Sequence, residues 1–457
     1  MGVIAGFPQI RFCEAPERGA ATRLNLGRAG ISWNGGTKVL RGARLGMPSL
    51  SGEAGSRSRY WTERTLELPL RVLGSKADAI NALGLVAREL VRESNWLEVW
   101  LDEQTGPRWF RTYAAAPEQL DLTHVVRDPD YDDIWTTTLR CPADPFALGE
   151  EQPLGSWTVT NHPSAGANPL RVTLPNVLGE VPASVRVKVA KSGSGSGAGG
   201  MLGPAVISSR VAPVVVGSPS WGGAVGGTTS DASMVAGSRR TTSGALAAWT
   251  AAASWTPPSL AADVARWTPL IRIAGSADGG AFWARWRIQS GAGSARYTEG
   301  KVVHVRSQAR WLHLGDVSRP GMDVEDAADL GASGATTVTL EVRRATSGGE
   351  LWLDGVMVLA PAGTDGDLLS LSPDAVGTGA VAVVVDGRHR RAALAAGTSP
   401  ARSPGVSGRW PMVHPGEDNV LTVLQNLNPT LTPGYTDSIT STATVTATTR
   451  GLYLWGV

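Results

Sequence analysis

The chain is poor in the residues that usually build metal sites and thiol chemistry. Its 457 residues include only two cysteines and six histidines. Cys13 and Cys141 lie far apart in the sequence and could approach in space, but a single pair in a chain of this size is no disulfide framework. The histidines are scattered, and none has the spacing of a metal-ligand pair. We therefore expect two buried thiols and no metal site.

The balance of charge and the absence of long apolar runs exclude two further classes. Lys and Arg total 42 against 40 Asp and Glu, a formal net charge of +2. The chain therefore has no large excess of basic residues, and we expect no nucleic-acid partner. No apolar run approaches the roughly 18 residues of a membrane span. Residues Met1–Pro8 lack the basic and apolar regions of a signal peptide. We expect a protein made in a cytoplasm, without a membrane span.

Catalytic motifs are missing as well. The chain has no G-x-S-x-G nucleophile elbow, no P-loop and no H-E-x-x-H sequence. Gly195, Gly197 and Gly200 match G-x-G-x-x-G, but they lie in a Gly/Ser-rich stretch with no helix after it. The acidic run Asp128–Asp133 lacks the glycine and glutamate of a calcium loop. Paired carboxylates of a glycosidase would become visible only in the fold. We predict no catalytic residues and no cofactor.

The clearest structural pattern runs from Thr65 to Tyr113. Apolar residues alternate over 65–72, which predicts a strand, and Pro69 indicates an edge or a bulge in it. Ser75 and Asp78 predict a capped helix start, followed by an apolar stripe. That stripe is Ile80, Leu83, Val86, Ala87 and Leu90. Residues 96–101 and 108–113 then predict a hairpin. The pattern is strand, single helix, hairpin.

The rest of the chain is predicted to be mainly β. The composition has 56 glycines and 17 tryptophans, and alternating segments separated by turns recur after residue 157. A Gly/Ser-rich stretch at 191–200 predicts a linker. We predict three domains: residues 1–150 with the helix, a discontinuous β-sandwich of 151–190 plus 396–457, and an inserted Trp-rich jelly roll over 201–395. The last strand, 441–455, should pair with the strands of 157–189.

Two pairs of residues in the inserted region are candidates for carbohydrate binding. Trp283 and Arg285 alternate with the apolar positions of one strand, and Trp311 and His313 alternate with those of another. An exposed tryptophan beside polar groups can stack on a sugar ring whose edge needs hydrogen bonds. The alternative is that these faces lie against a second sheet layer or a subunit interface.

Several stretches of the chain resemble phage tail proteins. Similarity to the N-terminal domain of siphophage distal tail proteins is carried by Leu66–Leu70, the helix Ser75–Val91, Trp96–Val99, Arg108–Tyr113 and Ala143–Gly149. Asn168–Val177 and Pro415–Leu421 resemble minor tail proteins of phages that infect actinobacteria. The matches cover about a third of the chain, and the inserted region departs from the pattern.

The resemblance implies a structural virion protein at the tail tip. Its N-terminal part would be β-barrel-like and would form a homo-oligomeric ring, a hexamer or a trimer, between the tail tube protein and the baseplate hub or tail-associated protein. The family has no catalytic residues to transfer. The inserted region resembles a carbohydrate-binding jelly roll, whose partner would be host cell-wall carbohydrate. A carbohydrate-binding protein that acts alone and a glycan depolymerase are the alternatives.

Overall fold

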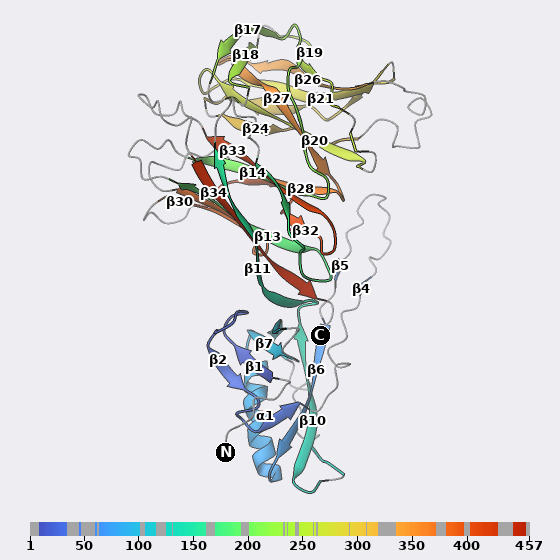
Figure 1. Ribbon diagram of the computed structural model, residues 1–457, viewed down its shortest axis with the longest axis vertical. Coiled ribbons are helices and arrows are strands. Elements are labelled where there is room, and N and C mark those ends of the chain that lie inside the picture. The colour runs from blue at the N-terminus through green and yellow to red at the C-terminus, as the bar shows by residue number, and fades with distance from the viewer. Residues whose placement is uncertain are drawn as a thin grey trace. The chain divides into compact units, whose positions relative to one another are not determined.

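The protein is mainly β with one helix, as the sequence predicts (Figure 1). The computed structural model describes residues 9–33, 45–46, 60–61, 64–100, 106–115, 125–129, 131–160, 170–192, 201–231, 234, 236–242, 246–258, 260–261, 264–291, 293–307, 309–318, 335–371, 381–396, 403–427 and 442–453. The core of the predicted linker, 193–200, lies outside the described residues. None of the sheets closes on itself, so a closed barrel is not formed by the described strands.

The chain divides into two compact units. Unit 1 comprises Met1–Gln152, Leu178–Ala183 and Arg450–Val457, and unit 2 comprises Pro153–Val177 and Ser184–Thr449. Three strands have residues in both units: β11 (Ala147–Thr160), β13 (Ala183–Ser192) and β34 (Thr442–Tyr453).

Unit 1 contains the predicted strand, helix and hairpin. Its elements are β1 (Gln9–Cys13), β2 (Thr22–Asn25), β3 (Ile31–Trp33), β4 (Leu45–Gly46), β5 (Tyr60–Trp61), β6 (Arg64–Leu73), α1 (Lys76–Leu90), β7 (Ser94–Trp100), β8 (Arg108–Tyr113), β9 (Val126–Arg127) and β10 (Ile134–Ala143). β7 and β8 form the predicted hairpin. β6 pairs along its whole length with β10, and with β3 only over Leu70–Val72. Pro69, which has no N–H to donate, thus lies just beyond the described pairing with β3.

Helix α1 starts as the sequence predicts. The Ser75 hydroxyl accepts a hydrogen bond from the Asp78 amide at 3.2 Å, and the Asp78 carboxylate accepts one from the Ser75 amide at 3.1 Å. These reciprocal bonds satisfy two amides of the first turn. Leu83, Val86 and Leu90 are buried against the sheet. Ile80 was expected in this stripe, but it is 39% exposed because Ala79 takes the inward position.

A buried carboxylate joins three strands of unit 1. Glu98 of β7 is 5% exposed and lies between Arg11 of β1 and Trp109 of β8. Arg11 donates to both carboxylate oxygens at 2.8 Å, and the Trp109 indole N–H donates at 3.0 Å. A buried charge is stable only when it is paired and hydrogen-bonded, as here.

Unit 2 is built from stacked sheets. The six-stranded sheet consists of β16 (Ser220–Trp221), β19 (Thr250–Trp255), β21 (Ala281–Ser290), β22 (Arg296–Tyr297), β23 (Lys301–His304) and β26 (Thr336–Thr346). The seven-stranded sheet consists of β15 (Val214–Val216), β17 (Val225–Ser230), β18 (Ser238–Thr242), β20 (Arg266–Gly275), β24 (Arg310–His313), β25 (Val317–Ser318) and β27 (Leu351–Ala362). The five-stranded sheet consists of β12 (Leu170–Leu174), β14 (Met201–Ser209), β28 (Gly366–Leu371), β31 (Val406–Gly408) and β33 (Asn419–Leu427).

The remaining strands of unit 2 belong to the same sheet as β13. They are β29 (Val381–Asp386), β30 (Arg391–Ala396) and β32 (Met412–Val413). β13 pairs with β34 from Val185↔Thr449 to Ser192↔Thr442, which confirms the predicted partner of the last strand. β14 pairs with β33 and β29 pairs with β13, although β14 and β29 fall within the predicted insertion of 201–395. The three-domain division stays a prediction.

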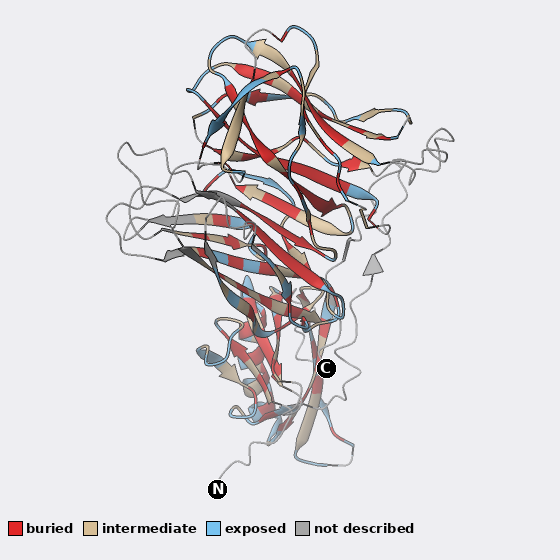
Figure 2. Ribbon diagram, turned by 45° about the horizontal axis from the view of Figure 1, so that its top comes forward, coloured by how far each residue is buried: buried red, intermediate tan, exposed pale blue. Residues whose placement is uncertain are grey.

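The six- and seven-stranded sheets share one core, visible as buried segments in Figure 2. Trp286 and Trp255 from the first sheet meet edge to face, with ring centroids 6.3 Å apart. Trp267 and Ile271 come from the second sheet. The opposite face of the seven-stranded sheet is also covered: Leu270, Trp311 and Val358 pack against residues of the five-stranded sheet, namely Ala205, Ile207, Leu368 and Leu424. The central strands β20 and β27 of the middle sheet are therefore buried on both faces over most of their length.

One acidic residue of the five-stranded sheet makes unit 2 sensitive to pH. Burial raises the pKa of Asp367 to about 6, although Arg409 and a hydrogen bond from the Met412 amide act in the other direction. The folded state therefore binds a proton more tightly than the unfolded state. This contribution to stability is full below pH 4 and is lost as the pH rises through 6.

We expect Asp367→Asn to raise the melting temperature of unit 2 at pH 7.5 and to change it little at pH 4, because the neutral amide avoids burying a charge. Two pKa units correspond to at most about 3 kcal/mol. Asp278→Asn is the matched control. Hydrogen bonds from Ser307 lower the pKa of Asp278, so this substitution should destabilise the protein at pH 7.5. Equal shifts for Asp367→Asn at both pH values would contradict the assignment.

Candidate functional site

The four residues predicted to bind carbohydrate lie on two different sheets. Trp283 and Arg285 belong to β21 in the six-stranded sheet, whereas Trp311 and His313 belong to β24 in the seven-stranded sheet. The structure brings the members of each pair together but does not join the two pairs into one surface.

Trp311 is buried, so the expectation that it is exposed is wrong. Its side chain is 5% accessible and packs with Leu270, Ile207 and Leu424. The alternating pattern of β24 correctly indicates two faces, but the five-stranded sheet covers the face that carries Trp311. This indole stabilises the contact between two sheets and is not available to a ligand.

His313 belongs to a polar link on the same sheet. Its Nε2 lies 4.0 Å from the Asp316 carboxylate, which also accepts a 2.6 Å hydrogen bond from the Thr268 hydroxyl. The interaction with His313, followed by the Thr268 bond, lowers the pKa of Asp316. His313 is thus engaged within the seven-stranded sheet.

Trp283 and Arg285 lie on the outer face of the six-stranded sheet, where side chains are half-buried. The Arg285 guanidinium lies 4.4 Å from the Trp249 ring centroid and 4.1 Å from that of Tyr297. Its Nε donates to the Glu341 carboxylate at 2.8 Å, and its Nη2 lies 2.7 Å from the same oxygen. Arg285 is therefore held between two aromatic rings and a carboxylate, and it fixes their positions.

A second arginine continues this row. The Arg343 guanidinium lies 5.2 Å from the Trp249 ring centroid and 5.9 Å from that of Trp283. In strand register, Arg343 is opposite Trp283 and Glu341 is opposite Arg285. Aromatic and cationic groups thus alternate along the face. We name Trp249, Trp283, Arg285, Tyr297 and Arg343 the outer aromatic face.

Gly300, just before β23, allows the backbone to lie close to this face. A Cβ added at Gly300 would lie 3.1 Å from the Trp249 ring and 3.8 Å from the Trp283 ring. The loop before β23 therefore packs directly against both indoles.

Sequence reasoning missed Trp249, Tyr297 and Arg343. Trp249 precedes β19 and Tyr297 lies in a two-residue strand, so neither belongs to an alternating run of useful length. Arg343 could have been found, since it alternates with the buried positions Val338, Leu340 and Val342 of β26.

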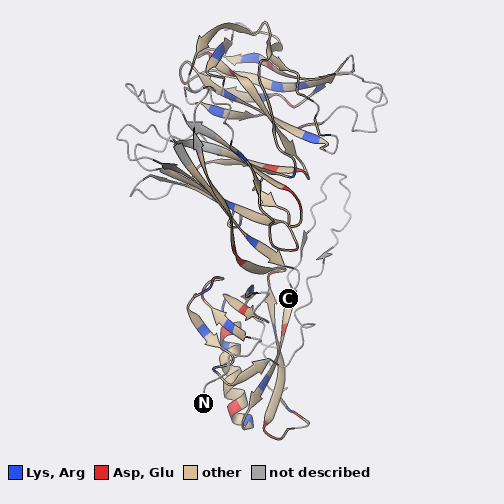
Figure 3. Ribbon diagram, in the orientation of Figure 1, with Lys and Arg blue, Asp and Glu red and all other residues tan. Residues whose placement is uncertain are grey.

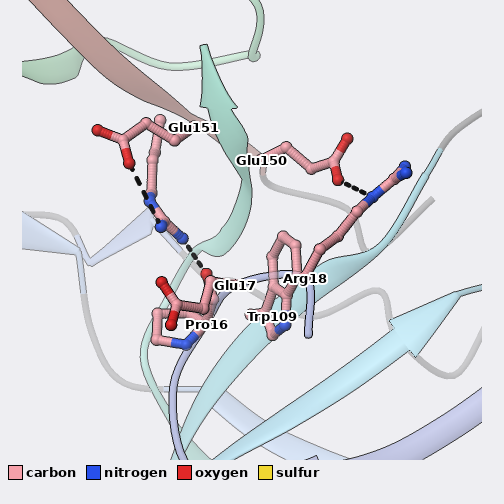
Figure 4. A pocket seen from close by; sticks show the side chains of 7 residues that line it. Pro16, Glu17, Arg18, Trp109, Glu150 and Glu151 are labelled. Atoms are coloured by element: carbon pink, nitrogen blue, oxygen red, sulfur yellow. Dashed lines mark hydrogen bonds and ion pairs between the residues drawn. The ribbon is translucent and has the colours of Figure 1, made fainter. Parts of the chain in front are cut away.

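Unit 1 contains a polar hollow of about 280 Å³ (Figure 4). It is lined by Pro16, Glu17, Arg18, Trp109, Glu150, Glu151 and Arg450. Arg18 pairs with Glu150, and Arg450 lies 3.8 Å from Glu151 and donates to the Pro16 carbonyl. Both carboxylates are thus engaged in ion pairs with arginines from other segments. The hollow serves to hold the end of β34 against the loop after β1.

Groups that could carry other chemistry are not assembled in the described part of the chain. Cys13 and Cys141 are free and buried, as predicted, and burial raises their pKa to about 11 and about 12. Such thiols stay protonated and unreactive. Among the described residues, no cluster of three His, Cys, Asp or Glu side chains could hold a metal ion. In the same residues, no helix is long and apolar enough to cross a membrane. Basic and acidic residues are interspersed along the described strands (Figure 3).

Comparisons with known proteins give weak likenesses. No protein-family model and no curated protein matches the chain. Among solved structures, the Dit protein of phage SPP1, described as a paradigm of the hub adsorption apparatus in phages infecting Gram-positive bacteria, is 9% identical, with a TM-score of 0.35 over 97% of this chain and 98% of that chain.

Two further structures are similar at a lower level. The baseplate of phage p2 in its activated conformation contains a chain that is 11% identical, with a TM-score of 0.20 over 76% of this chain and 98% of that one. Infectious bursal disease virus contains one that is 9% identical, with a TM-score of 0.14 over 67% and 81%. At these values the function has to be argued from the residues of this chain.

Two tryptophan substitutions should separate a core residue from a surface residue. Trp311→Ala removes a buried indole between two sheets and should destabilise unit 2 by about 3–5 kcal/mol. Trp283→Ala removes a half-buried side chain from an outer face and should cost about 1 kcal/mol or less. Chemical denaturation followed by circular dichroism measures both. Equal losses would contradict the assigned positions.

Proposed function

We propose that this chain is a structural subunit of the tail tip of a long-tailed phage that infects actinobacteria. Unit 1 would assemble copies into a ring, a hexamer or a trimer, that joins the tail tube to the baseplate hub. The resemblance of Leu66–Leu70, the α1 segment and the β7–β8 hairpin to distal tail proteins supports this role. The main support for it in the structure is a group of exposed apolar side chains in unit 1.

Unit 1 exposes large apolar side chains at one end of the β6–β10 ladder. Leu73 is 65% exposed, Val126 is 62% exposed and Tyr131 is 56% exposed. Exposed apolar groups that gather at one place indicate a protein interface. We name these three residues the ladder-end cluster.

Pairing and hydrogen bonds bring the members of this cluster to the same place. Leu73 is opposite Ile134 in the β6–β10 register, and Val126 is opposite Thr136 in the β9–β10 register. The Tyr131 amide donates to Asp128, and the Ile134 amide donates to Tyr131. The cluster therefore belongs to one folded corner.

Another copy of the chain is the occupant we propose for this cluster. A ring requires each subunit to offer one surface to the next, so a patch of apolar residues on a folded corner suits such a contact. Asp128 at the same corner is already paired with Arg71 at 3.0 Å, so burying this corner would not leave that carboxylate uncompensated.

A structural role without catalysis accords with the paired carboxylates of the hollow and the protonated thiols. Unit 2 would carry the recognition function, through the outer aromatic face, toward host cell-wall carbohydrate. The aromatic face also favours a second candidate, a carbohydrate-binding protein that acts alone. The two candidates differ in self-association.

Leu73→Glu combined with Val126→Glu should prevent ring formation, because two carboxylates cannot be buried in an apolar contact. Analytical ultracentrifugation should find a hexamer or trimer for the native chain and a monomer for the double variant. Val406→Glu is the control, since Val406 is 45% exposed in unit 2, and it should leave the assembly intact. A native chain that stays monomeric at high concentration and does not bind tail-tube ends would refute the ring.

A further inference from the structure

We infer that the outer aromatic face binds an acidic polysaccharide, one whose sugars carry carboxylate or phosphodiester groups. This inference deepens the proposed recognition function and rests on it. It follows from the charges between the aromatic rings, which a site for neutral sugars would not need.

The aromatic rings supply the part of the site that any sugar requires. Trp249 and Trp283 are both half-buried, whereas Tyr297 is 50% exposed. In the described part of the chain, neither indole N–H has a hydrogen-bond acceptor. Neither indole nitrogen is a buried polar atom left without a partner. Each indole N–H can therefore donate to a sugar hydroxyl group, and the accessible parts of the rings can contact sugar C–H groups.

The arginines supply an excess of positive charge. Among the described residues, Glu341 is the carboxylate that pairs with arginines of this face, and its side chain is only 10% exposed. Arg285 Nη2 lies 2.7 Å from a carboxylate oxygen of Glu341, whereas Arg287 Nη1 lies 4.0 Å from the other oxygen. Glu341 therefore neutralises one arginine well and a second one poorly.

Arg343 has no carboxylate partner among the described residues. It is half-buried, and its guanidinium lies over the rings of Trp249 and Trp283. A cation–π contact uses the face of a guanidinium or the charge on it and does not consume its N–H donors. A planar cation held in this way suits two-point binding of a carboxylate or a phosphate.

The positions of the arginines relative to the tryptophans suit a polymer with acidic groups. Arg343 lies between the two indoles, so an anionic group held by it would place the adjoining sugar ring over a tryptophan. Arg287, 35% exposed, lies farther along the same strand as Trp283. A polymer with an acidic group on successive sugars could use both arginines.

Binding of the full-length chain to three polymers tests the inference: polygalacturonate carries carboxylates, a glycerol-phosphate teichoic acid carries phosphodiesters, and dextran is neutral. We expect at least one acidic polymer to bind roughly tenfold more tightly than dextran and to weaken with salt. Which acidic polymer binds identifies the acidic group.

Arg343→Ala should weaken binding to the acidic polymer roughly five- to tenfold and affect dextran binding much less, because the charge-assisted contact that it removes is made only to an anionic group. Arg343→Lys should recover part of the loss. Trp283→Ala should weaken binding to every polymer that binds. Arg240→Ala is the matched control, since Arg240 stacks on Trp221 at 5.2 Å away from the face.

Four results would overturn the inference: dextran binding as tightly as the acidic polymers, no binding to any polymer, no effect of Arg343→Ala, or tighter binding of a single-stranded oligonucleotide. Sedimentation of the same samples reports ring assembly separately. A chain that assembles but binds no polymer refutes the acidic-glycan site alone, whereas a monomer that binds refutes the ring.

Discussion

The apolar contact between the seven-stranded and five-stranded sheets decides which surfaces of unit 2 are free. Trp311, Leu270 and Val358 fill this contact, and they bury the second face of the middle sheet. Two sheets of a sandwich ordinarily leave two outer faces in solvent. Here the central strands β20 and β27 of the seven-stranded sheet are buried on both faces over most of their length. The outer side of the six-stranded sheet, by contrast, presents the aromatic residues Trp249, Trp283 and Tyr297 at a half-buried or exposed level.

Local patterns in the sequence predict local structure well. The capping box at Ser75 and the hairpin of β7 and β8 follow from residues close in the chain. Trp311 was placed wrongly because a period of two distinguishes two faces of a strand without saying what covers each. Trp249 and Tyr297 come from short segments, and only the sheet register brings them beside Arg285. The outer aromatic face could therefore be predicted only in part.

The two units divide the chemistry in a consistent way. Unit 1 keeps its charges paired inside, with Glu98 held by Arg11 and Trp109, and exposes apolar groups at the ladder end. Unit 2 buries its apolar groups between sheets and presents cations between aromatic rings on one face. Exposed apolar groups suit a permanent contact with another subunit. Cations and rings suit a reversible contact with a charged sugar polymer.

Immunogold labelling of purified virions with an antibody against this chain tests the tail-tip role most directly. The antibody should be raised against the whole chain, so that epitopes of both units remain available if one is covered by assembly. If the proposed role is right, gold particles will lie at the end of the tail farthest from the capsid, on intact virions. Label on the capsid, or absence of the chain from purified virions, would contradict the account.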